Sequence, residues 1–392
     1  MTKLKADWLA WPFLKDIVSA LGPENIRFVG GVVRDTLVRR DIKDIDAATR
    51  YLPEETKTRL EACGIKVIPT GLEHGTVTAV RDGQTVEITT LRHDVETDGR
   101  HAKVAFTDDW LEDAKRRDFT MNALYLAADG TLFDPFGGEA AARAGQVCFI
   151  GDAEKRIEED ALRILRFFRF HAHYGKGDLD AEGLRAVTVK VALLEQLSAE
   201  RVRDEICKIL AAPDPMPSLR AMTEVDVWAH TPVVGADLQA LEILLAAEEA
   251  LDFDPDILMR FAAITGTRAS SAARVLRMSN RQMKTLKAIR HGFDSVPPVD
   301  AKSMRAFLYW YGPEAGQAAV LAHTEAQGED VLQVLANWEI PELPVRGQDL
   351  IILGMKPSPE ISQKLRQIEA RWVESDFSLS KEVLLAPLKN VS

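Results

Sequence analysis

The segment of residues 26–48, IRFVGGVVRDTLVRRDIKDIDAA, constrains the fold more than any other part of the chain. Its apolar start at residues 26–29 predicts a short buried strand. Gly30 and Gly31 then turn the chain, and we expect a helix to begin at Val32. A second strand is expected over residues 44–48, so this segment indicates an α/β fold.

The same segment carries residue types that suit a nucleotide and a metal ion. Glycines let the backbone approach a ligand, the helix N-terminus favours phosphate, and Arg34 adds a planar fork for phosphate oxygens. Residues i and i+2 of a strand share a face, so Asp44 and Asp46 would project together. Paired carboxylates beside phosphates suit Mg²⁺. A glycine pair alone is more often an ordinary turn, and Asp-x-Asp alone is more often an exposed strand end.

In this order and spacing, these residues resemble the signature of class II nucleotidyltransferases of the DNA polymerase β superfamily. That group contains bacterial CCA-adding enzymes and poly(A) polymerases. Residues 116–123, RRDFTMNA, match another block of the family, and residues 85–92, TVEITTLR, read as a strand. The resemblance implies that Glu87 is a third catalytic carboxylate and that Arg117 reaches the triphosphate. The ordinary alternatives are a cross-strand ion pair for Glu87 and a charged helix end for Arg117.

Residues 159–170, EDALRILRFFRF, carry charges at every third position, namely Asp160, Arg163, Arg166 and Arg169. Such spacing ordinarily indicates a solvated, ion-paired helix face. In the family, however, this helix selects the incoming base without a nucleic-acid template. Cytosine and adenine both present an amino donor beside a ring-nitrogen acceptor, which a carboxylate and a guanidinium complement. Asp160 and Arg163 would therefore select C and A, with Arg166 and Arg169 contacting phosphate or anchoring the helix.

Two further segments resemble the family. Residues 198–205, SAERVRDE, are similar to its SxERxxxE helix, which supports the base-reading helix, so we expect support rather than chemistry here. Residues 344–361 resemble the GxDLxxLGxxPGP element near the C-terminus of bacterial CCA-adding enzymes, with Ser358 in place of a glycine.

The domain organisation follows from these matches and from proline-rich boundaries. We expect an α/β nucleotidyltransferase head with a five-stranded sheet, as the resemblance implies, followed by all-α neck, body and tail. The predicted bounds are 1–150 for the head, 151–212 for the neck, 213–296 for the body and 297–392 for the tail. Residues 92–113, including Asp98-Gly99-Arg100, are expected to form a loop.

Charge is distributed unevenly along the chain. The net charge is −11, yet residues 268–305 hold nine basic and two acidic side chains. A basic stretch in an acidic chain suits an RNA backbone, which makes Arg274, Arg277, Arg281 and Lys284 candidate RNA contacts. Solvated helix faces are an equally good interpretation. Three scattered cysteines and no secretory signal predict a cytoplasmic protein without structural zinc, and no apolar run is long enough for a membrane span.

The resemblance as a whole implies a CCA tRNA nucleotidyltransferase. It would use Mg²⁺ held by Asp44 and Asp46, take CTP and ATP, and act on tRNA, with no protein partner implied. Gly30, Gly31, Arg34 and Arg117 would hold the triphosphate. A bacterial poly(A) polymerase or an enzyme adding only A or CC shares these motifs and remains open. A non-catalytic RNA-binding protein is disfavoured because both aspartates are present.

Overall fold

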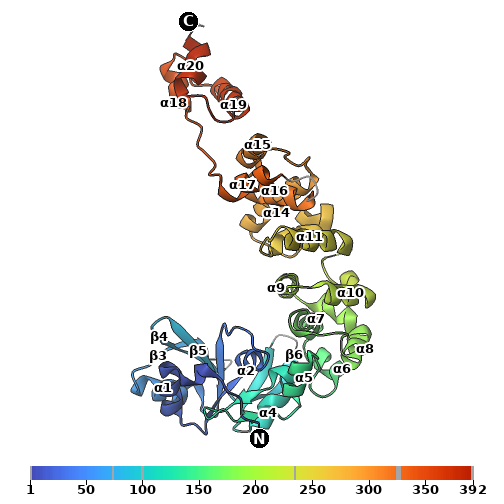
Figure 1. Cartoon of the computed structure of the whole chain (residues 1–392). Helices are drawn as coiled ribbons and strands as arrows, with labels where there is room; N and C mark the ends of the chain where they lie inside the picture. Colours follow the sequence, from blue (N-terminus) through green and yellow to red (C-terminus); the bar gives the residue numbers. More distant parts are fainter. Residues whose placement is uncertain (1, 73–74, 99–100, 234, 324–327, 390–392) are drawn as a thin grey trace. The chain divides into compact units, whose positions relative to one another are not determined.

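The computed structural model describes residues 2–72, 75–98, 101–233, 235–323 and 328–389. The chain forms two compact units, Met1–Val234 and Gly235–Ser392. The first unit combines a mixed sheet with helices, and in the described part of the second every element is helical (Figure 1). An α/β region followed by a helical remainder was expected, and this is confirmed. The division into head, neck, body and tail stays a prediction.

The sheet of the first unit has seven strands in the order β3-β4-β5-β2-β1-β8-β9. Five strands were expected, and that number is wrong because β8 and β9, of two residues each, extend the sheet beside β1. The strands are β1 (Ile26–Val29), β2 (Ile45–Thr49), β3 (Lys66–Gly71), β4 (Thr76–Arg81), β5 (Gln84–Thr90), β8 (Tyr125–Leu126) and β9 (Leu132–Phe133).

Strand pairing separates the two faces of the sheet. β2 pairs antiparallel with β1 and parallel with β5, and its register places Asp46 beside Glu87. Ile45 and Ala47 point to one face and join a core cluster with Phe28, while Asp46 points to the opposite face because side chains alternate along a strand.

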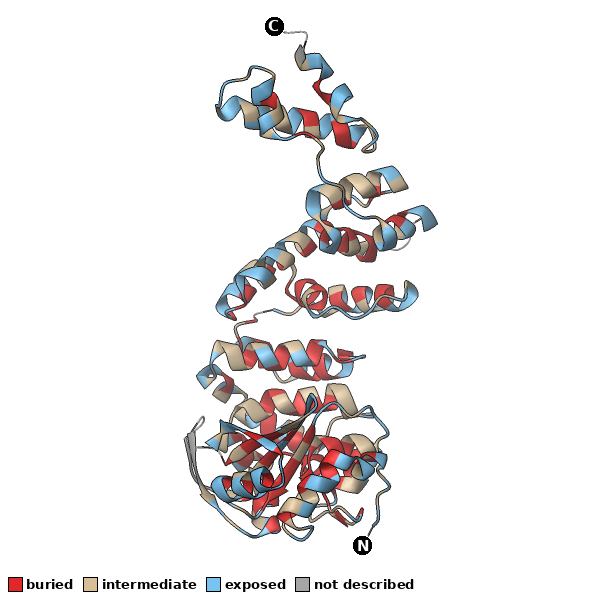
Figure 2. Cartoon of the chain, turned by 90° about the vertical axis from the view of Figure 1, so that its left-hand side faces the viewer, coloured by how far each residue is buried: buried red, intermediate tan, exposed pale blue. Residues whose placement is uncertain are grey.

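Helices cover the first face with apolar side chains. Phe13, Leu14 and Ile17 of α1 pack in the same buried cluster as Val86 and Ile88 of β5. Buried segments of the first unit gather in its strands and in the helices next to them (Figure 2). A smaller cluster, which includes Ala48, Trp110 and Tyr125, covers part of the opposite face. The face that carries Asp46 and Glu87 is therefore only partly filled by hydrophobic residues, which leaves room for polar groups.

The segment expected to be a loop over residues 92–113 is instead ordered secondary structure. Strands β6 (Arg92–Asp98) and β7 (His101–Phe106) form a two-stranded antiparallel sheet, and helix α4 follows at Trp110–Lys115. The loop prediction is wrong because the two strands satisfy each other's backbone groups by antiparallel pairing, which a high content of charged residues does not prevent. Gly99 and Arg100 lie outside the described residues.

Some helices of the first unit precede the strands or lie between them in sequence, and the others follow the last strand, β9. They are η1 (Asp7–Ala10), α1 (Pro12–Leu21), α2 (Gly31–Leu37), α3 (Pro53–Ala62), α4, η3 (Thr120–Asn122), α5 (Gly138–Ala144), α6 (Ala153–Glu159), α7 (Leu162–Tyr174), α8 (Ala181–Lys190), η4 (Val191–Gln196), α9 (Ala199–Leu210), α10 (Met216–Glu224) and η5 (Val227–His230).

The second unit contains helices and two small apolar clusters, one including Met304 and Leu308 and the other including Leu350 and Trp372. Ser279 caps α14 through a reciprocal capping box with Gln282, which separates α14 from α13. None of the helices in the described ranges combines the length and apolar composition needed to cross a membrane. The helices are α11 (Leu238–Ala250), α12 (Ile257–Thr265), η6 (Gly266–Arg268), α13 (Ala269–Val275), α14 (Asn280–Asp294), α15 (Ala301–Tyr311), α16 (Pro313–Ala322), α17 (Glu329–Asn337), α18 (Gly347–Ile352), α19 (Pro359–Glu374) and α20 (Lys381–Lys389).

Candidate active site

Two guanidinium groups flank the glycine turn between β1 and α2. Gly30 has a φ of +69°, a conformation that side-chain-bearing residues rarely adopt. A Cβ atom at Gly30 would lie 3.6 Å from Nη1 of Arg117, and one at Gly31 would lie 3.7 Å from Nη2 of Arg34. The turn is therefore an open backbone edge with a positive charge on either side, an arrangement suited to phosphate oxygens.

Arg34 is held in place by three partners. Its Nη1 donates to Asn122 Oδ1 at 2.6 Å, its Nη2 donates to the Tyr174 hydroxyl at 2.7 Å, and its Nε donates to Asp35 at 3.0 Å. The guanidinium also lies 4.1 Å from the centroid of the Tyr174 ring. Arg34 is consequently buried and preorganised rather than extended into solvent.

Arg117 is anchored from the opposite side of the turn. Its Nε donates to the Tyr125 hydroxyl at 3.0 Å, and its Nη2 lies 3.3 Å from Asp113. Burial acts to lower the pKa of Arg117, but Tyr125 and Asp113 outweigh it and raise that pKa above its ordinary value. Arg117 is therefore a permanent positive charge next to Gly30.

Asp46 and Glu87 bring negative charge to the same face of the sheet. Burial, followed by the charge of Glu87, raises the pKa of Asp46 to about 6, with a smaller contribution from Asp44, while Arg117 acts in the opposite direction. Asp44 is exposed and lies directly before β2. The strand was expected to begin at residue 44, but it begins at Ile45. The nearby cation Arg117 therefore does not offset the cost of ionising Asp46. A bound metal ion would supply the missing positive charge.

A cavity of about 690 Å³ is lined by some of these groups, whereas Gly30, Glu87 and Arg117 are not among its lining residues. Gly31, Arg34, Asp44 and Asp46 form one part of its lining, and Arg169, Phe170, His173 and Tyr174 of α7 form another, with Lys43 and Lys208 among the remaining lining residues. The cavity therefore combines carboxylates with cations and aromatic rings, and these groups fit a nucleotide with its phosphates and metal.

The carboxylates fit Mg²⁺ under one condition. No group of three or more acidic, histidine or cysteine side chains in the described residues is arranged to hold a metal ion by itself. Mg²⁺ commonly binds through one or two carboxylates, water and substrate phosphates. The oxygen donors of Asp44 and Asp46 meet that pattern if the nucleotide supplies further oxygens.

A chain of hydrogen bonds joins α7 to the glycine turn. Arg166 Nε donates to Asp118 Oδ2 at 2.7 Å, Asn122 donates to Asp118 Oδ1 at 3.0 Å, and Arg34 donates to Asn122. Burial opposes ionisation of Asp118, but Arg166 and Asn122 keep its pKa below the ordinary value. Sequence reasoning assigned no role to Asp118 or Asn122, although both stand in the RRDFTMNA block.

Asp160 and Arg163 do not pair with each other. Asp160 ends α6 and accepts from Arg201 Nη2 at 2.9 and 2.8 Å, while Arg163 Nη1 donates to Glu159 at 2.6 Å. The Asp160 side chain is 27 % exposed and that of Arg163 is 11 % exposed. Both orientations are therefore held by neighbours, while Asp160 keeps some accessible surface.

Helix α9 supports this region through charged contacts. In addition to the contact of Arg201 with Asp160, Glu205 lies 2.6 Å from Arg169, and Glu205 is buried. The four charged residues that were expected to select the base, contact phosphate or anchor the helix thus have different partners, and Arg169 alone among them lines the cavity with Asp44 and Asp46. The SxERxxxE match contains Arg201 and could have indicated this residue as a partner of Asp160. It was interpreted only as a helix that supports its neighbour.

The basic segment of the second unit is partly gathered around a hollow of about 410 Å³. Arg274 of α13 lines it together with Lys284 and Lys287 of α14. The other two predicted contacts, Arg277 and Arg281, are not among its lining residues. Lys287 was missed as a candidate, although it stands one helical turn after Lys284.

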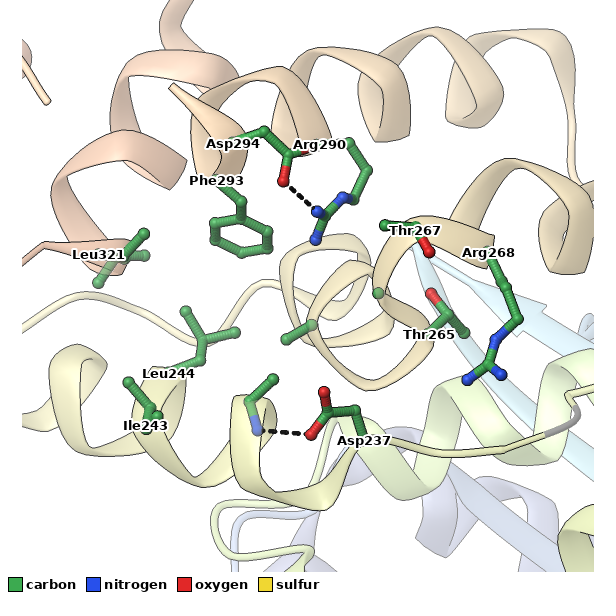
Figure 3. A pocket seen from close by; sticks show the side chains of 14 residues that line it. Asp237, Ile243, Leu244, Thr265, Thr267, Arg268, Arg290, Phe293, Asp294 and Leu321 are labelled. Carbon is green, nitrogen blue, oxygen red and sulfur yellow. Dashed lines mark hydrogen bonds and ion pairs between the residues drawn. The ribbon is translucent and has the colours of Figure 1, made fainter. Parts of the chain in front are cut away.

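A larger cavity of about 570 Å³ in the second unit offers less charge to a ligand (Figure 3). Arg290 pairs with Asp294, and Arg268 donates to the carbonyl oxygen of Gly235. The remaining lining includes Ile243, Leu244 and other apolar side chains. Its arginines are already bonded, and Asp237, the other lining carboxylate besides Asp294, accepts from the backbone N–H of Ala240. This cavity therefore does not compete with the first as a catalytic centre.

Comparisons with known proteins agree with this geometry. Residues 26–148 match the family model of the poly A polymerase head domain, and residues 178–236 match a probable RNA and SrmB- binding site of polymerase A. The chain is 34 % identical to mitochondrial CCA tRNA nucleotidyltransferase 1 of Mus musculus, over 96 % of this chain and 89 % of the relative. It is 31 % identical to a CCA-adding enzyme of Bacillus cytotoxicus, over 91 % of this chain and 92 % of the relative.

A solved structure gives the same result for the fold. The CCA-adding enzyme of Bacillus stearothermophilus in complex with CTP superposes with a TM-score of 0.78 at 28 % identity, covering 96 % of this chain and 97 % of that chain. Similarity therefore extends across both units and is not confined to the sheet.

Proposed function

Because the chain belongs to the family of CCA tRNA nucleotidyltransferases, we propose that it adds C, C and A to the 3′ end of tRNA from CTP and ATP. The observation that carries this proposal is the glycine turn flanked by Arg34 and Arg117, with Asp46 and Glu87 on the adjacent sheet face. These groups together suit a nucleoside triphosphate and its metal ion.

Gly30, Gly31, Arg34 and Arg117 hold the triphosphate in this proposal. Arg34 and Arg117 are already oriented by Asn122, Tyr174, Tyr125 and Asp113, so little reorganisation is needed when phosphates bind. Asp44 and Asp46, with Glu87 beside them, hold Mg²⁺, which when bound activates the 3′-hydroxyl and neutralises the pyrophosphate. The reaction transfers a nucleotidyl group to that hydroxyl and releases pyrophosphate.

Asp160 and Arg163 select the base. The carboxylate accepts from the exocyclic amine of cytosine or adenine, and the guanidinium donates to the ring nitrogen. Uracil and guanine reverse this donor and acceptor pattern, and a mismatch of buried polar groups is strongly disfavoured. Arg201 and Glu159 support the proposal because they orient the two side chains before a nucleotide binds. Arg166 and Arg169 position α7 through Asp118 and Glu205.

Arg274, Arg277, Arg281 and Lys284 contact the tRNA backbone in this proposal. Arg274 and Lys284 line one hollow, and neither forms an ion pair with another residue in the described ranges. Unneutralised cations gathered on one surface suit phosphates. A cytoplasmic location also stays a proposal, supported by three cysteines without a disulfide, whereas the mouse relative is named mitochondrial.

The test supplies CTP and ATP separately to tRNA transcripts that end before, within and after CCA. We expect two C residues from CTP alone on the shortest transcript, one A from ATP on a transcript ending in CC, and no addition after CCA. A run of A residues would indicate a poly(A) polymerase, and addition of A alone or of CC alone would indicate a partial activity. Asp46→Asn should remove all incorporation, whereas Glu54→Gln, an exposed carboxylate on α3, should not.

A further inference from the structure

An aromatic cluster lies where helices α14 and α15 meet in the second unit. His291 packs against Tyr311 with ring centroids 3.9 Å apart, and Phe307 lies 5.0 Å from Tyr311 and 6.1 Å from His291. Tyr311 is 46 % exposed and His291 is also exposed. The cluster therefore presents aromatic surface to solvent, in contrast to Trp372, which is 4 % exposed in the apolar cluster with Leu350.

The cluster continues a row of positive charges on one helix. Lys284, Lys287 and His291 are spaced by three and four residues, so they share a face of α14. Lys284 and Lys287 line the 410 Å³ hollow together with Arg274, and in the described ranges neither lysine forms an ion pair. Asp294, the acidic residue next along the helix, is paired with Arg290 and so does not neutralise the row.

This combination of groups fits RNA better than it fits a protein surface. Cations track a phosphate backbone, and exposed aromatic rings stack on unpaired bases without strict sequence preference. Lys284 and His291 are two helical turns apart, about 10 Å along the axis of α14, which is within the reach of a few nucleotides. A strand that lies along the lysines would thus bring a base close to the rings within a few nucleotides.

We propose that His291, Phe307 and Tyr311 form a stacking platform for one unpaired base of the tRNA, while adjacent phosphates lie along Arg274, Lys284 and Lys287. This inference rests on the proposed function, because that function supplies the RNA. It adds a base contact, remote in sequence from the nucleotide site, to what was otherwise a purely electrostatic surface. The competing explanation is that the rings only hold α14 against α15.

The test measures binding of a tRNA transcript lacking CCA, without nucleotides, across a range of salt concentrations. Tyr311→Ala should weaken binding by about tenfold and leave the salt dependence unchanged, since stacking releases no counterions. Tyr311→Phe keeps the ring and should bind within about twofold of the unmodified protein. His291→Ala, at an exposed position, should also weaken tRNA binding. This variant replaces Tyr311→Ala in the test if Tyr311→Ala lowers the melting temperature of the protein.

Two controls separate stacking from other effects. Trp11→Ala removes another exposed ring, 42 % accessible, from the first unit and should leave binding unchanged. A fully paired RNA duplex offers no unpaired internal base, so Tyr311→Ala should not weaken its binding.

Normal tRNA binding by both Tyr311→Ala and His291→Ala, or equal losses for tRNA and duplex, would overturn the platform. Incorporation of CTP by the unmodified protein is measured in parallel, so failure of the proposed function is recognised independently of these binding results.

Discussion

Asp46→Asn is expected to stabilise the metal-free protein above pH 6 while it abolishes nucleotide incorporation. In the folded chain, burial and the neighbouring Glu87 raise the pKa of Asp46 to about 6 from an ordinary value of 3.8. A carboxyl group with a raised folded-state pKa contributes stability below its unfolded pKa and loses it as the pH rises through the folded value. Above pH 6 the folded protein therefore carries an unfavourable charge, which asparagine removes.

The magnitude follows from the size of this shift. A difference of about two pKa units, at 1.36 kcal/mol per unit, corresponds to about 3 kcal/mol. Solvent screens the part of Asp46 that remains accessible, so the expected gain is about 1 to 3 kcal/mol at pH 8. The gain should shrink as the pH falls through 6 and vanish near pH 4, where the aspartic acid is neutral in the folded state.

The assay is denaturant unfolding in EDTA at pH 5 and pH 8, followed by hydrogen exchange of peptides that contain β2, because the two units need not unfold together. Glu54→Gln removes an exposed carboxylate from the same unit and should show no comparable dependence on pH. Equal stability differences at both pH values, or lower stability of Asp46→Asn at pH 8, would refute the electrostatic reasoning. Adding Mg²⁺ and CTP should stabilise the unmodified protein more than the variant.

Three other variants test the remaining parts of the site. Asn122→Ala should raise the KM for CTP and ATP by about tenfold, because Arg34 loses a 2.6 Å contact. Steady-state kinetics measures this change, and a fall in kcat with an unchanged KM would indicate that Asn122 has only a structural role. Asp160→Ala should lower the rate and relax discrimination against UTP and GTP, measured by single-nucleotide incorporation, and an unchanged preference would exclude base reading by this carboxylate. Joint neutralisation of Arg274, Lys284 and Lys287 should lower the salt slope of tRNA binding by about 2 to 3, whereas an unchanged slope would assign these charges to a solvated face.

The sequence alone determined the features that depend on neighbouring residues. Gly30 and Gly31 specify the turn after β1, since Gly30 adopts a positive φ that other residues resist. Ser279 and Gln282 specify the start of α14 through a local capping box. The motif order was sufficient to indicate the family and an α/β region followed by helices. The turn and the order of the regions were predicted correctly because turns and apolar patterns are decided over a few residues.

The tertiary structure decided which distant groups meet. Parallel pairing of β2 with β5 sets Asp46 beside Glu87, and burial together with the charge of Glu87 raises the pKa of Asp46. The position of Arg117 opposite Gly30, and the chain from Arg166 through Asp118 to Asn122, join segments that local patterns do not connect. The charge spacing of residues 159–170 likewise did not reveal that Arg201 contacts Asp160 and that Arg163 contacts Glu159. Contacts of this kind depend on how elements pack, and packing is a property of the whole fold rather than of any short pattern.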